Sequence, residues 1–532
     1  MVTRNNGTKQ GSVAVKERLA MPVLPITNIL RFSVPDAIRI STHDDSTFTN
    51  PLPTSSSGFT LNALGVAGFF GGDSAVNGMA TANLVPYRRW FGWYNTPGSY
   101  EIAKKFGPLA DWAMSDGLFP GGEHDPTKLF GIHGKEGPPF IAVHSGSNFP
   151  HTQHPAYLMM KKTRSLPPTR HTNIDGRRTI RTTVTIVNLR HVPNVTERPL
   201  LPFSWGYSAL LALVPIIVSV LGCAGCIFVA DWFCLASIAL GIVANGLSCF
   251  VIGSGNLTFE HHEPAEKAPP GDGVLKGDSD VVLLIGREGA INAFVRGRFT
   301  LQFRKHVKER PGSRRGEERS PEMVQSYTNR RQQPKRFVPP QGAIGPCAIL
   351  LIVQFLSQLL LIPQGTLFGQ IMFVATLGAS WLYNVFLSSI DREGIQTRIL
   401  FDVLKIDEEK DIQKYELNTW TETTAFTCLV LAWVNHIKAP SELLDGMLPN
   451  NTLVWRAWKE TMARKLRSQA LFRRNTGFNF TDEDWEGDGL DPADRDLLQT
   501  FLTDSENAWK AWTAVRDTPQ MKGLRPLVGG NA

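Results

Sequence analysis

The residues best suited to hold a metal lie in the N-terminal third of the chain. His124, His133, His144, His151 and His154 occur within 31 positions, and His151-x-x-His154 offers two ligands, with Asp125 or Glu136 as a third. This spacing does not match the His-Glu-x-x-His arrangement, which aligns two histidines on one helix face. The stretch also lacks a helical pattern that would position them. We therefore expect surface histidines rather than a metal site.

Two further patterns resemble metal sites only in part. Cys223-x-x-Cys226 has a zinc-like spacing, but no second pair of ligands lies nearby. Asp482-x-Asp484-x-Glu486-Gly487 resembles the start of a calcium loop, but position 12 would be Ala493, where a bidentate glutamate is required. No Ser/His/Asp set, phosphate-binding loop or paired-carboxylate motif stands out. The sequence thus predicts no catalytic, cofactor-binding or metal-binding residue and no cofactor.

Uncharged stretches define the fold class. Hydrophobic residues make up 42% of the 532-residue chain and charged residues 19%, and three stretches lack any Asp, Glu, Lys, Arg or His: 199–230, 232–259 and 337–390. Crossing a bilayer as a helix takes about 20 predominantly apolar residues. In hydrocarbon every backbone polar group must be paired within the segment, which favours helices. The composition excludes a disordered chain, a coiled coil and a disulfide scaffold.

We predict an α-helical membrane protein with four spans arranged as two hairpins. Hairpin 1 covers residues 206–252 and turns at Asp231; hairpin 2 covers 344–388 and turns at Pro363-Gln364-Gly365. The four spans are Gly206–Val229, Trp232–Ile252, Ile344–Ile362 and Leu367–Ser388. Pro215 should kink the first of them. The run 424–434 is too short to span, and we expect a buried or interfacial helix there; a fifth span is the alternative.

Basic flanks predict the orientation of these spans. Arg190 and Arg198 precede the first span, Arg392 and Arg398 follow the fourth, and neither short turn carries Lys or Arg. Because Lys and Arg accumulate on the cytoplasmic side, we expect both termini and the central loop to be cytoplasmic. The membrane would be an endomembrane or the plasma membrane.

Polar residues inside the spans are uncharged: Asn245, Gln354, Ser357, Gln358, Gln370 and Asn384. We expect them to form hydrogen bonds between helices. We also expect a stripe of small residues to form a helix-packing face: Ser237, Gly241, Ala244 and Ser248. A solute path lined by Asn245 and Gln354 is the alternative. The absence of an ionisable residue from the spans disfavours a proton relay.

The regions outside the spans differ in character. Residues 1–200 are rich in Gly, Pro and Ser and predict a loosely structured region, with one strand at Thr179–Leu189. The loop 253–342 contains a predicted β-hairpin (280–303) and a polybasic segment (304–336) with eleven Lys/Arg against four acids. Residues 391–532 predict helices and an acidic tail. The helix at 452–474 would either lie in the membrane interface or pack against its own domain.

The segments GREGAINAFVRGRF and GTLFGQIMFVATLGASWLYNVFLSSIDREG resemble an orphan group of fungal multi-pass membrane proteins. The resemblance covers roughly residues 200–420. It implies an integral membrane architecture and no particular activity.

These observations favour a non-enzymatic scaffold or adaptor at the cytoplasmic face. The polybasic segment would either bind anionic lipids, at about 1 kcal/mol per Lys or Arg, or only fix the orientation. Nucleic-acid binding is disfavoured, because the segment lacks interleaved aromatic residues. Homo- or hetero-oligomers through the spans would be compatible with this role. The alternatives are a small oligomeric channel or transporter and a membrane enzyme with an unfamiliar site.

Overall fold

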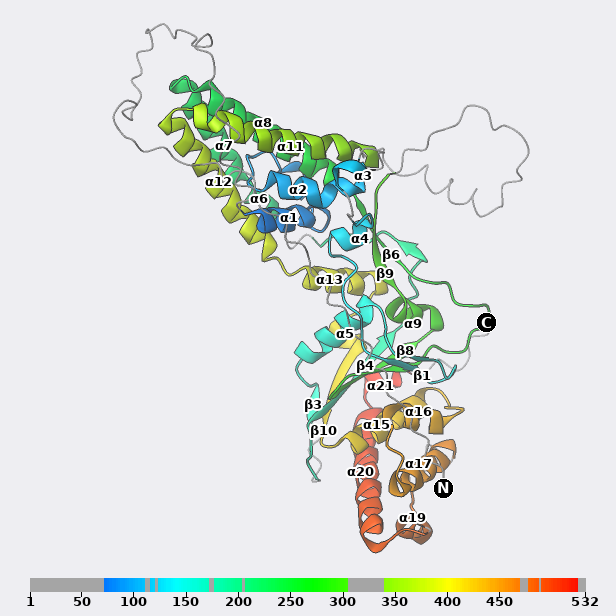
Figure 1. Cartoon of the computed structure of the whole chain (residues 1–532). Helices are drawn as coiled ribbons and strands as arrows, with labels where there is room; N and C mark the ends of the chain where they lie inside the picture. Colours follow the sequence, from blue (N-terminus) through cyan, green and yellow to red (C-terminus); the bar gives the residue numbers. More distant parts are fainter. Residues whose placement is uncertain are drawn as a thin grey trace, which may run out of the picture. The chain divides into compact units, whose positions relative to one another are not determined.

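The computed structural model describes residues 71–110, 115–119, 123–171, 177–202, 206–304, 339–468, 477–487 and 489–524. All of them fall in one unit, Asn50–Ala532. Figure 1 shows that this unit contains long helices that lie side by side and a mixed sheet with helices around it. The polybasic segment 304–336 lies outside the described residues except for Arg304, so its contact with anionic lipid stays a prediction.

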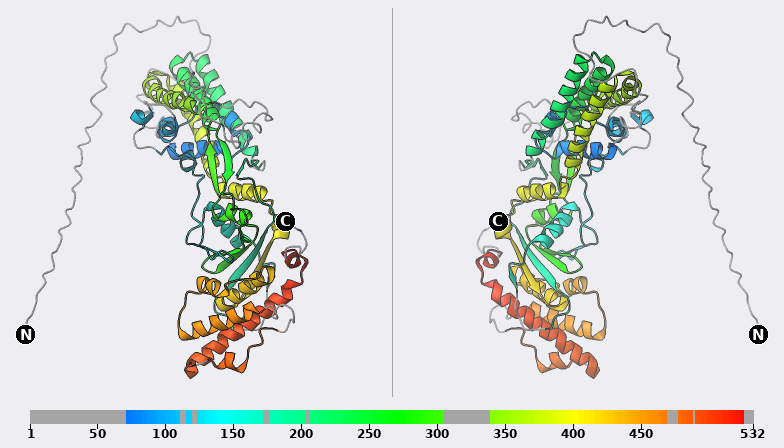
Figure 2. Two further views of the ribbon diagram at one scale, coloured as in Figure 1. Left: turned by 90° about the vertical axis from the view of Figure 1, so that its right-hand side faces the viewer. Right: turned by 90° about the vertical axis from the view of Figure 1, so that its left-hand side faces the viewer.

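Four apolar helices form what we call the bundle: α7 (Leu213–Phe228), α8 (Trp232–Ile252), α11 (Ile344–Leu361) and α12 (Leu367–Ser388) (Figures 1 and 2). Three of them are long and apolar enough to cross a membrane: α8, α11 with its flanking turns, and α12, with mean hydropathies of 2.1, 2.1 and 1.5. The prediction of a helical protein with apolar helices of spanning length is confirmed. The helix α7 has only 16 residues.

The predicted first span is interrupted near its start. The helix α6 (Gly206–Leu210) ends before α7 begins at Leu213, and Pro215 lies in the first turn of α7. Proline has no N–H to donate and its ring clashes with the carbonyl of the preceding turn, which breaks a helix at this point. The kink expected at Pro215 is therefore present as a break.

The outward surface of the bundle is apolar. Its exposed large side chains come from all four helices: Leu213, Val214, Ile217, Val220, Leu221, Ile227, Phe228, Phe233, Val243, Leu247, Val353, Leu356, Leu360, Ile371, Leu382 and Val385. Proteins that fold in water rarely expose an apolar surface this continuous. Hydrocarbon is the solvent that matches it.

Asp231 ties the turns of the two hairpins together. Its Oδ1 accepts a hydrogen bond from the Cys234 N–H at 3.0 Å and so caps α8. Its Oδ2 accepts from the N–H and the hydroxyl of Thr366, the N-cap residue of α12, at 2.7 and 2.8 Å. The carboxylate is 3% exposed. The end of the bundle that holds these turns is called the far end below, and the end where α8 stops and α11 starts is called the near end.

Outside the bundle, seven strands form a mixed sheet in the order β2-β1-β7-β8-β4-β10-β3. The central pair, β4 and β8, is parallel, and β10 lies antiparallel to β4. A second sheet has the order β5-β6-β9. The strand bounds are β1 Phe140–Ala142, β2 Asn148–Phe149, β3 Arg170–His171, β4 Thr182–Leu189, β5 Thr196–Glu197, β6 Asn256–Glu260, β7 Gly273–Lys276, β8 Asp280–Gly286, β9 Arg298–Gln302 and β10 Ile412–Leu417.

The predicted hairpin at 280–303 is wrong. Its two strands, β8 and β9, belong to different sheets, and the helix α9 (Glu288–Val295) connects them. The apolar run Val281–Ile285 is buried because it pairs with strands on both sides, as a central strand does. Glu288 in the first turn and the buried Ala290, Ile291 and Phe294 are the signature of an amphipathic helix, which outweighed the turn signal of the glycines.

The helix α15 (Trp420–Val434) is buried along almost its whole length. It packs on β4 and β10 and against α20 (Pro492–Arg516), and these residues share one hydrophobic core. The expectation of a buried helix at 424–434 is therefore confirmed, rather than the fifth span. The remaining C-terminal helices are α13 Arg392–Leu404, α14 Glu408–Asp411, α16 Pro440–Met447, α17 Leu453–Arg467, α19 Asp482–Glu486 and α21 Pro519–Lys522.

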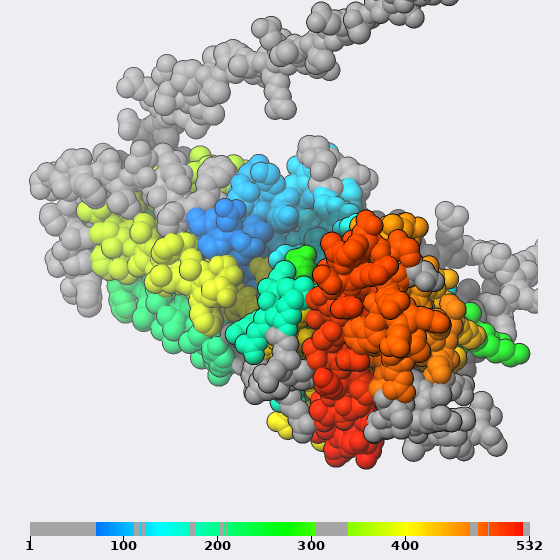
Figure 3. Space-filling model, turned by 90° about the horizontal axis from the view of Figure 1, so that it is seen from below, coloured from blue at the N-terminus to red at the C-terminus, as the bar shows by residue number. Residues whose placement is uncertain are grey.

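The helix predicted at 452–474 packs against its own domain. Trp455 stacks on Phe501 of α20 with ring centroids 4.1 Å apart, and Trp458 is fully buried and donates to the Ser505 hydroxyl at 3.0 Å. Figure 3 shows the red atoms of α20 lying against the orange atoms of α17. The interfacial alternative for this helix is not supported, because its tryptophan face is covered by protein.

The expectation of a loosely structured N-terminal region is wrong for its described part. Helices α1 (Gly72–Ala80) and α2 (Ser99–Phe106) pack on α12 and α11, and the predicted strand at Thr179–Leu189 is present as β4. Short helices α3 (Ser115–Leu118) and α4 (Pro126–Leu129) and the longer α5 (His154–Ser165) follow. Hydrophobic side chains of this region, such as Phe106 and Phe130, lie in the main core.

Candidate functional site

The histidine pair does not converge on a metal site. The ring nitrogens of His154 accept from the Lys135 N–H and contact the Gln396 side chain, both at 3.0 Å. Burial lowers the pKa of His154, so its neutral form is favoured. His151 faces solvent beside Glu136, 3.7 Å away, and Asp125 caps α4. Among the described residues no group of three His, Cys, Asp or Glu side chains could hold a metal ion.

The segment that resembled a calcium loop is a helix instead. Asp484 lies in α19, where it closes a capping box with Thr481. It also pairs with Arg464 and with Lys465, the latter at 2.8 Å. Burial alone would raise the pKa of Asp484, but Lys465 and Thr481 hold it below its ordinary value. This carboxylate therefore joins α19 to α17.

The sequence predicted that the polar residues of the bundle bond between helices. In the structure they do not bond mainly to one another. Four of them bond to a single non-helical segment, Gly92–Thr96, which runs from the 3-10 turn η5 (Arg88–Trp90) to α2. We call this segment the inserted loop. The four side chains are Asn245, Gln354, Gln358 and Asn384. Gln370 instead holds the far-end turn through the carbonyls of Ile362 and Gly365.

Asn95 is the centre of this site. Its side-chain amide donates to the Thr376 hydroxyl at 2.9 Å and its Oδ1 accepts from Gln358 at 3.2 Å. Its backbone N–H donates to the Ser219 hydroxyl at 3.1 Å, and its carbonyl accepts from Ser380. Helices α7, α11 and α12 thus all bond to one residue that is fully buried.

The fourth helix, α8, bonds to the loop before Asn95, and α11 and α12 bond to it again after Asn95. The Asn245 amide of α8 donates to the carbonyls of Gly92 and Tyr94 at 2.7 and 3.2 Å. Thr96 bonds to Gln354 through its carbonyl and to Asn384 through its hydroxyl. The backbone of the loop, which makes no helical or sheet bonds, finds its partners in these side chains.

Arg88 lies in η5, four residues before the loop, and is 1% exposed. Its partners in the described part of the chain are all neutral: the Phe91 carbonyl, the Cys249 sulfur and the Tyr94 hydroxyl, the last at 2.7 Å. Its guanidinium also lies over the rings of Tyr94 and Tyr383, at 5.8 and 5.2 Å from their centroids. Such cation–π contacts compensate part of the cost of burying a charge.

Of the buried polar atoms without a hydrogen-bond partner in the described structure, three belong to side chains that bond to the inserted loop: Arg88 Nε, Gln354 Oε1 and Gln358 Oε1. Buried polar atoms are almost always paired, because an unpaired one keeps its full desolvation cost. The interior of the bundle therefore contains polar atoms that its own hydrogen bonds leave unpaired.

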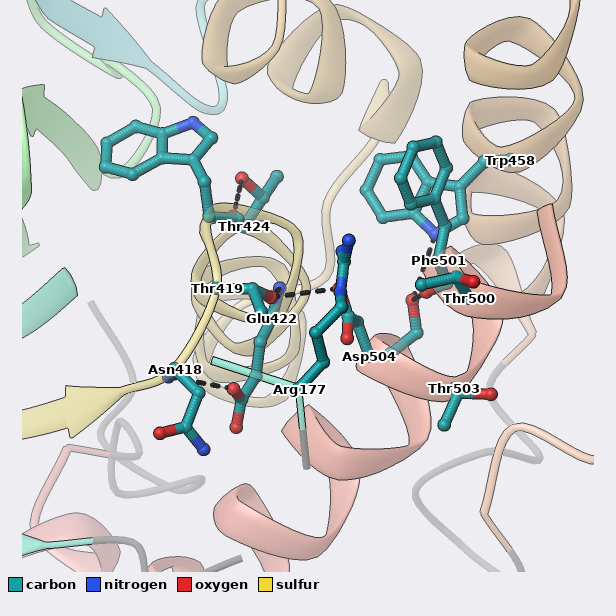
Figure 4. Close-up of polar contacts among 12 residues, drawn as sticks. Arg177, Asn418, Thr419, Glu422, Thr424, Trp458, Thr500, Phe501, Thr503 and Asp504 are labelled. Carbon is teal, nitrogen blue, oxygen red and sulfur yellow. Dashed lines mark hydrogen bonds and ion pairs between the residues drawn. The ribbon is translucent and has the colours of Figure 1, made fainter. Parts of the chain in front are cut away.

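A second buried polar cluster lies at the N-terminus of α15 (Figure 4). Asp504 of α20 accepts from Arg177 and from the Thr419 hydroxyl, each at 3.0 Å, and Glu422 accepts from the Asn418 N–H at 2.9 Å. Burial raises the pKa of Glu422, with a further contribution from the charge of Asp504. Burial also raises the pKa of Asp504, against the opposing effect of Arg177. Because these bonds cap a helix and join it to α20, the cluster has a structural explanation.

A hollow of about 420 Å³ lies beside β10, with Lys414, Gln413 and Tyr415 in its wall. Lys414 donates to the carbonyls of Thr163, Arg164 and Leu166, which end α5. All three donors of this ammonium are used in closing that helix end, so the lysine has none left for a ligand.

Fold and site together define the class: a largely helical protein with three helices long and apolar enough to cross a membrane, whose apolar bundle contains a polar, non-helical insertion. No protein-family model, no curated protein and no solved structure matches the chain. The sequence interpretation had found the amides of the bundle but not the loop that binds them. The number of amides was the signal in the sequence that could have indicated the loop, since so many uncharged polar groups in apolar helices require partners.

Proposed function

We propose that this protein is a four-span integral membrane scaffold, with α7–α8 and α11–α12 as its two hairpins and no enzymatic activity. The observation that carries the proposal is the inserted loop. Asn95 lies beside Gly241, about 14 Å along α8 from its start, which is a little under half the length of that helix. Non-helical backbone at such a depth is tolerated only where protein surrounds it. A loop that bonds to all four helices makes the bundle a closed, fixed support.

The four-span arrangement is supported by the far end. Asp231 bonds across both hairpin turns, which requires that the two turns lie on the same side of a membrane. Neither turn carries Lys or Arg, so the positive-inside rule assigns the far end to the non-cytoplasmic side. Both termini and the loop 253–342 are then cytoplasmic. In this orientation the two sheets and the C-terminal helices present their surfaces to the cytoplasm.

A cysteine-labelling map tests the orientation. Gln364 lies exposed at the far end and Ser389 exposed just after α12. In sealed vesicles that keep the cytoplasmic side inside, Gln364→Cys should react with a membrane-impermeant maleimide, and Ser389→Cys only after permeabilisation. Reaction of both positions from the same side would contradict the span assignment of α12.

A channel or transporter is the second candidate, and one observation favours it. The unpaired Gln354 and Gln358 oxygens and Arg88 Nε lie beside the loop, where water or a solute would satisfy them. Reconstitution into planar bilayers separates the two proposals. The scaffold predicts no conductance for the unaltered protein, whereas a channel predicts a conductance that Asn245→Ala or Gln354→Ala changes.

A further inference from the structure

Three aromatic side chains in the inserted loop or just before it are exposed. Tyr87 is 61%, Trp90 49% and Trp93 41% exposed, and all three lie within seven residues. Large aromatic side chains with one polar group are characteristic of the boundary between lipid and water, where one end of the ring stays in contact with water. In a protein surrounded only by water, three such side chains together would be costly.

The position of these side chains along the bundle is set by their contacts with α8. The ring centroids of Trp90 and Phe250 are 4.9 Å apart, and Trp93 lies directly over Gly246. Both contacts fall in the last two turns of α8, at the near end. The opposite end of the same helix begins with Trp232, which is 61% exposed.

The separation of the two aromatic levels matches a bilayer. Position 250 follows position 232 by 18 helical steps, which at 1.5 Å each extend about 27 Å. The hydrocarbon core of a bilayer is about 30 Å thick. Between the two levels α8 exposes Val243 and Leu247, which are apolar. Trp232 and Trp90 therefore lie where the two boundaries of the hydrocarbon would be.

Among the described residues of the bundle and of the segments packed on it, positive charge lies at the level of the near end. The Arg89 guanidinium lies over the rings of Trp90 and Phe250, at 5.0 and 5.8 Å from their centroids. Lys104 and Lys105 are exposed in the last turn of α2, which reaches the near end because the Gln341 side chain donates to the Leu109 carbonyl. A cation held at this level attracts anionic head groups, and each one near the surface contributes about 1 kcal/mol. The far-end turns have no Lys or Arg.

We infer that Tyr87, Arg89, Trp90, Trp93 and Phe250 form a docking surface for phospholipid head groups, in which the positive charge of Arg89 favours anionic lipids. This surface would fix the depth of the bundle and the position at which the inserted loop enters it. The inference rests on the membrane insertion proposed above. It is separate from the predicted lipid contact of segment 304–336, since it uses other residues.

Depth-dependent quenching tests the location. Full-length variants Trp90→Cys, Trp232→Cys, Val243→Cys and Leu453→Cys, each in a Cys223→Ala background, are labelled with a fluorophore and placed in nanodiscs that contain nitroxide lipids. The labels at 90 and 232 should be quenched more by a shallow nitroxide than by a deep one, and the label at 243 more by the deep one. Leu453 is exposed on α17, outside the bundle, and should respond to neither.

The control positions distinguish failure of the docking surface from failure of membrane insertion. If the labels at 232 and 243 respond as expected but the label at 90, like that at 453, is quenched by neither nitroxide, the proposed docking surface is wrong. The surface at Trp90 is then exposed to water or covered by protein. If 232 and 243 also behave like 453, membrane insertion itself fails.

Native mass spectrometry of the detergent-purified protein with phosphatidylserine tests the role of Arg89. Arg89→Ala should weaken lipid retention by about fivefold, the effect expected for one cation at an anionic surface. Lys510→Ala, which removes an exposed cation from α20, should leave retention unchanged. Equal effects of the two substitutions would overturn the assignment of Arg89, because they would reflect net charge alone.

Discussion

Gly241 offers a direct test of the inserted loop, because a single methyl group at this position meets Asn95. A Cβ built on Gly241 would overlap the Asn95 Oδ1 and lie 2.9 Å from its Cγ and 3.3 Å from the Gln354 amide nitrogen. To reach an ordinary contact distance the Asn95 side chain must move by roughly 1 Å. That movement stretches its bonds to Thr376 and Gln358.

The expected cost follows from three contributions. Overpacking of a tight site costs about 1–3 kcal/mol. Two weakened hydrogen bonds between bundle segments add about 0.6 kcal/mol each. Alanine is the better helix former and returns about 1 kcal/mol. Gly241→Ala should therefore lower the free energy of unfolding by roughly 1–3 kcal/mol.

Gly378→Ala is the matched control. Gly378 also lies in the middle of a bundle helix, α12, but a Cβ there has no neighbour within 4 Å. Only the gain in helix propensity remains, so this variant should be as stable as the unaltered protein or more so. The measurement is the fraction of protein that stays monodisperse in detergent after heating. Its midpoint should fall by roughly 2–10 °C for Gly241→Ala and should not fall for Gly378→Ala.

A double-mutant cycle decides whether Asn95 is the cause. Asn95→Ala removes the atoms that the new methyl group meets, so Gly241→Ala should cost less in that background. An equal cost of Gly241→Ala with and without the Asn95 side chain would refute the packing of the loop against α8.

The other predictions concern single carboxylates. Asp231→Ala removes the acceptor of three hydrogen bonds and should lower the free energy of unfolding by about 2–4 kcal/mol. Asp391→Ala removes a single cap bond and should lower it by only about 1 kcal/mol. Equal melting midpoints of the two variants would contradict the link between the hairpins. Burial raises the pKa of Glu422, so its contribution to stability should be lost as the pH rises from the ordinary glutamate value through the raised one, and Glu422→Gln should flatten that dependence in thermal melts. The pKa of Asp484 is lowered despite burial, chiefly by Lys465, so its stabilisation should be present above the ordinary aspartate value and disappear on acidification; Asp484→Asn should already lack it at neutral pH.

Apolar continuity made the helices of the bundle predictable. The ranges Trp232–Ile252 and Leu367–Ser388 agree residue for residue with α8 and α12, and Ile344–Ile362 exceeds α11 by one residue. The reason is that lipid-compatible helices must satisfy their own backbone, so length and apolarity alone define them. Pro215 likewise acts through its own missing N–H, a local effect that no partner is needed to predict.

Elements that depend on distant partners were predicted less well. The strands β4 and β8 are paired although the register partners Thr183 and Asp280 are 97 positions apart in the sequence. The sequence near β8 favoured the nearer partner, β9. A buried central strand and one arm of a hairpin both read as a short apolar run, so periodicity cannot distinguish them. The helix α9 between them was hidden by the turn signal of Gly286 and Gly289.

The inserted loop shows what a polarity argument can and cannot supply. Asn245, Gln354, Gln358 and Asn384 are each buried at 2% exposure or less, and each carries a donor that apolar surroundings cannot satisfy. Four apolar helices that packed only on one another would have had to pair these amides in twos across their interfaces. Backbone carbonyls and the Thr96 hydroxyl accept from three of these amides, and the Asn95 side-chain oxygen accepts from Gln358. Only a non-helical segment has backbone carbonyls to spare. The amides therefore require an inserted segment of irregular backbone, but they do not select which one, because any short stretch with free carbonyls meets the same chemical need. The choice of Gly92–Thr96 follows from its neighbours: Arg88 with Tyr94 on one side and α2 on the other anchor it to the bundle at both ends.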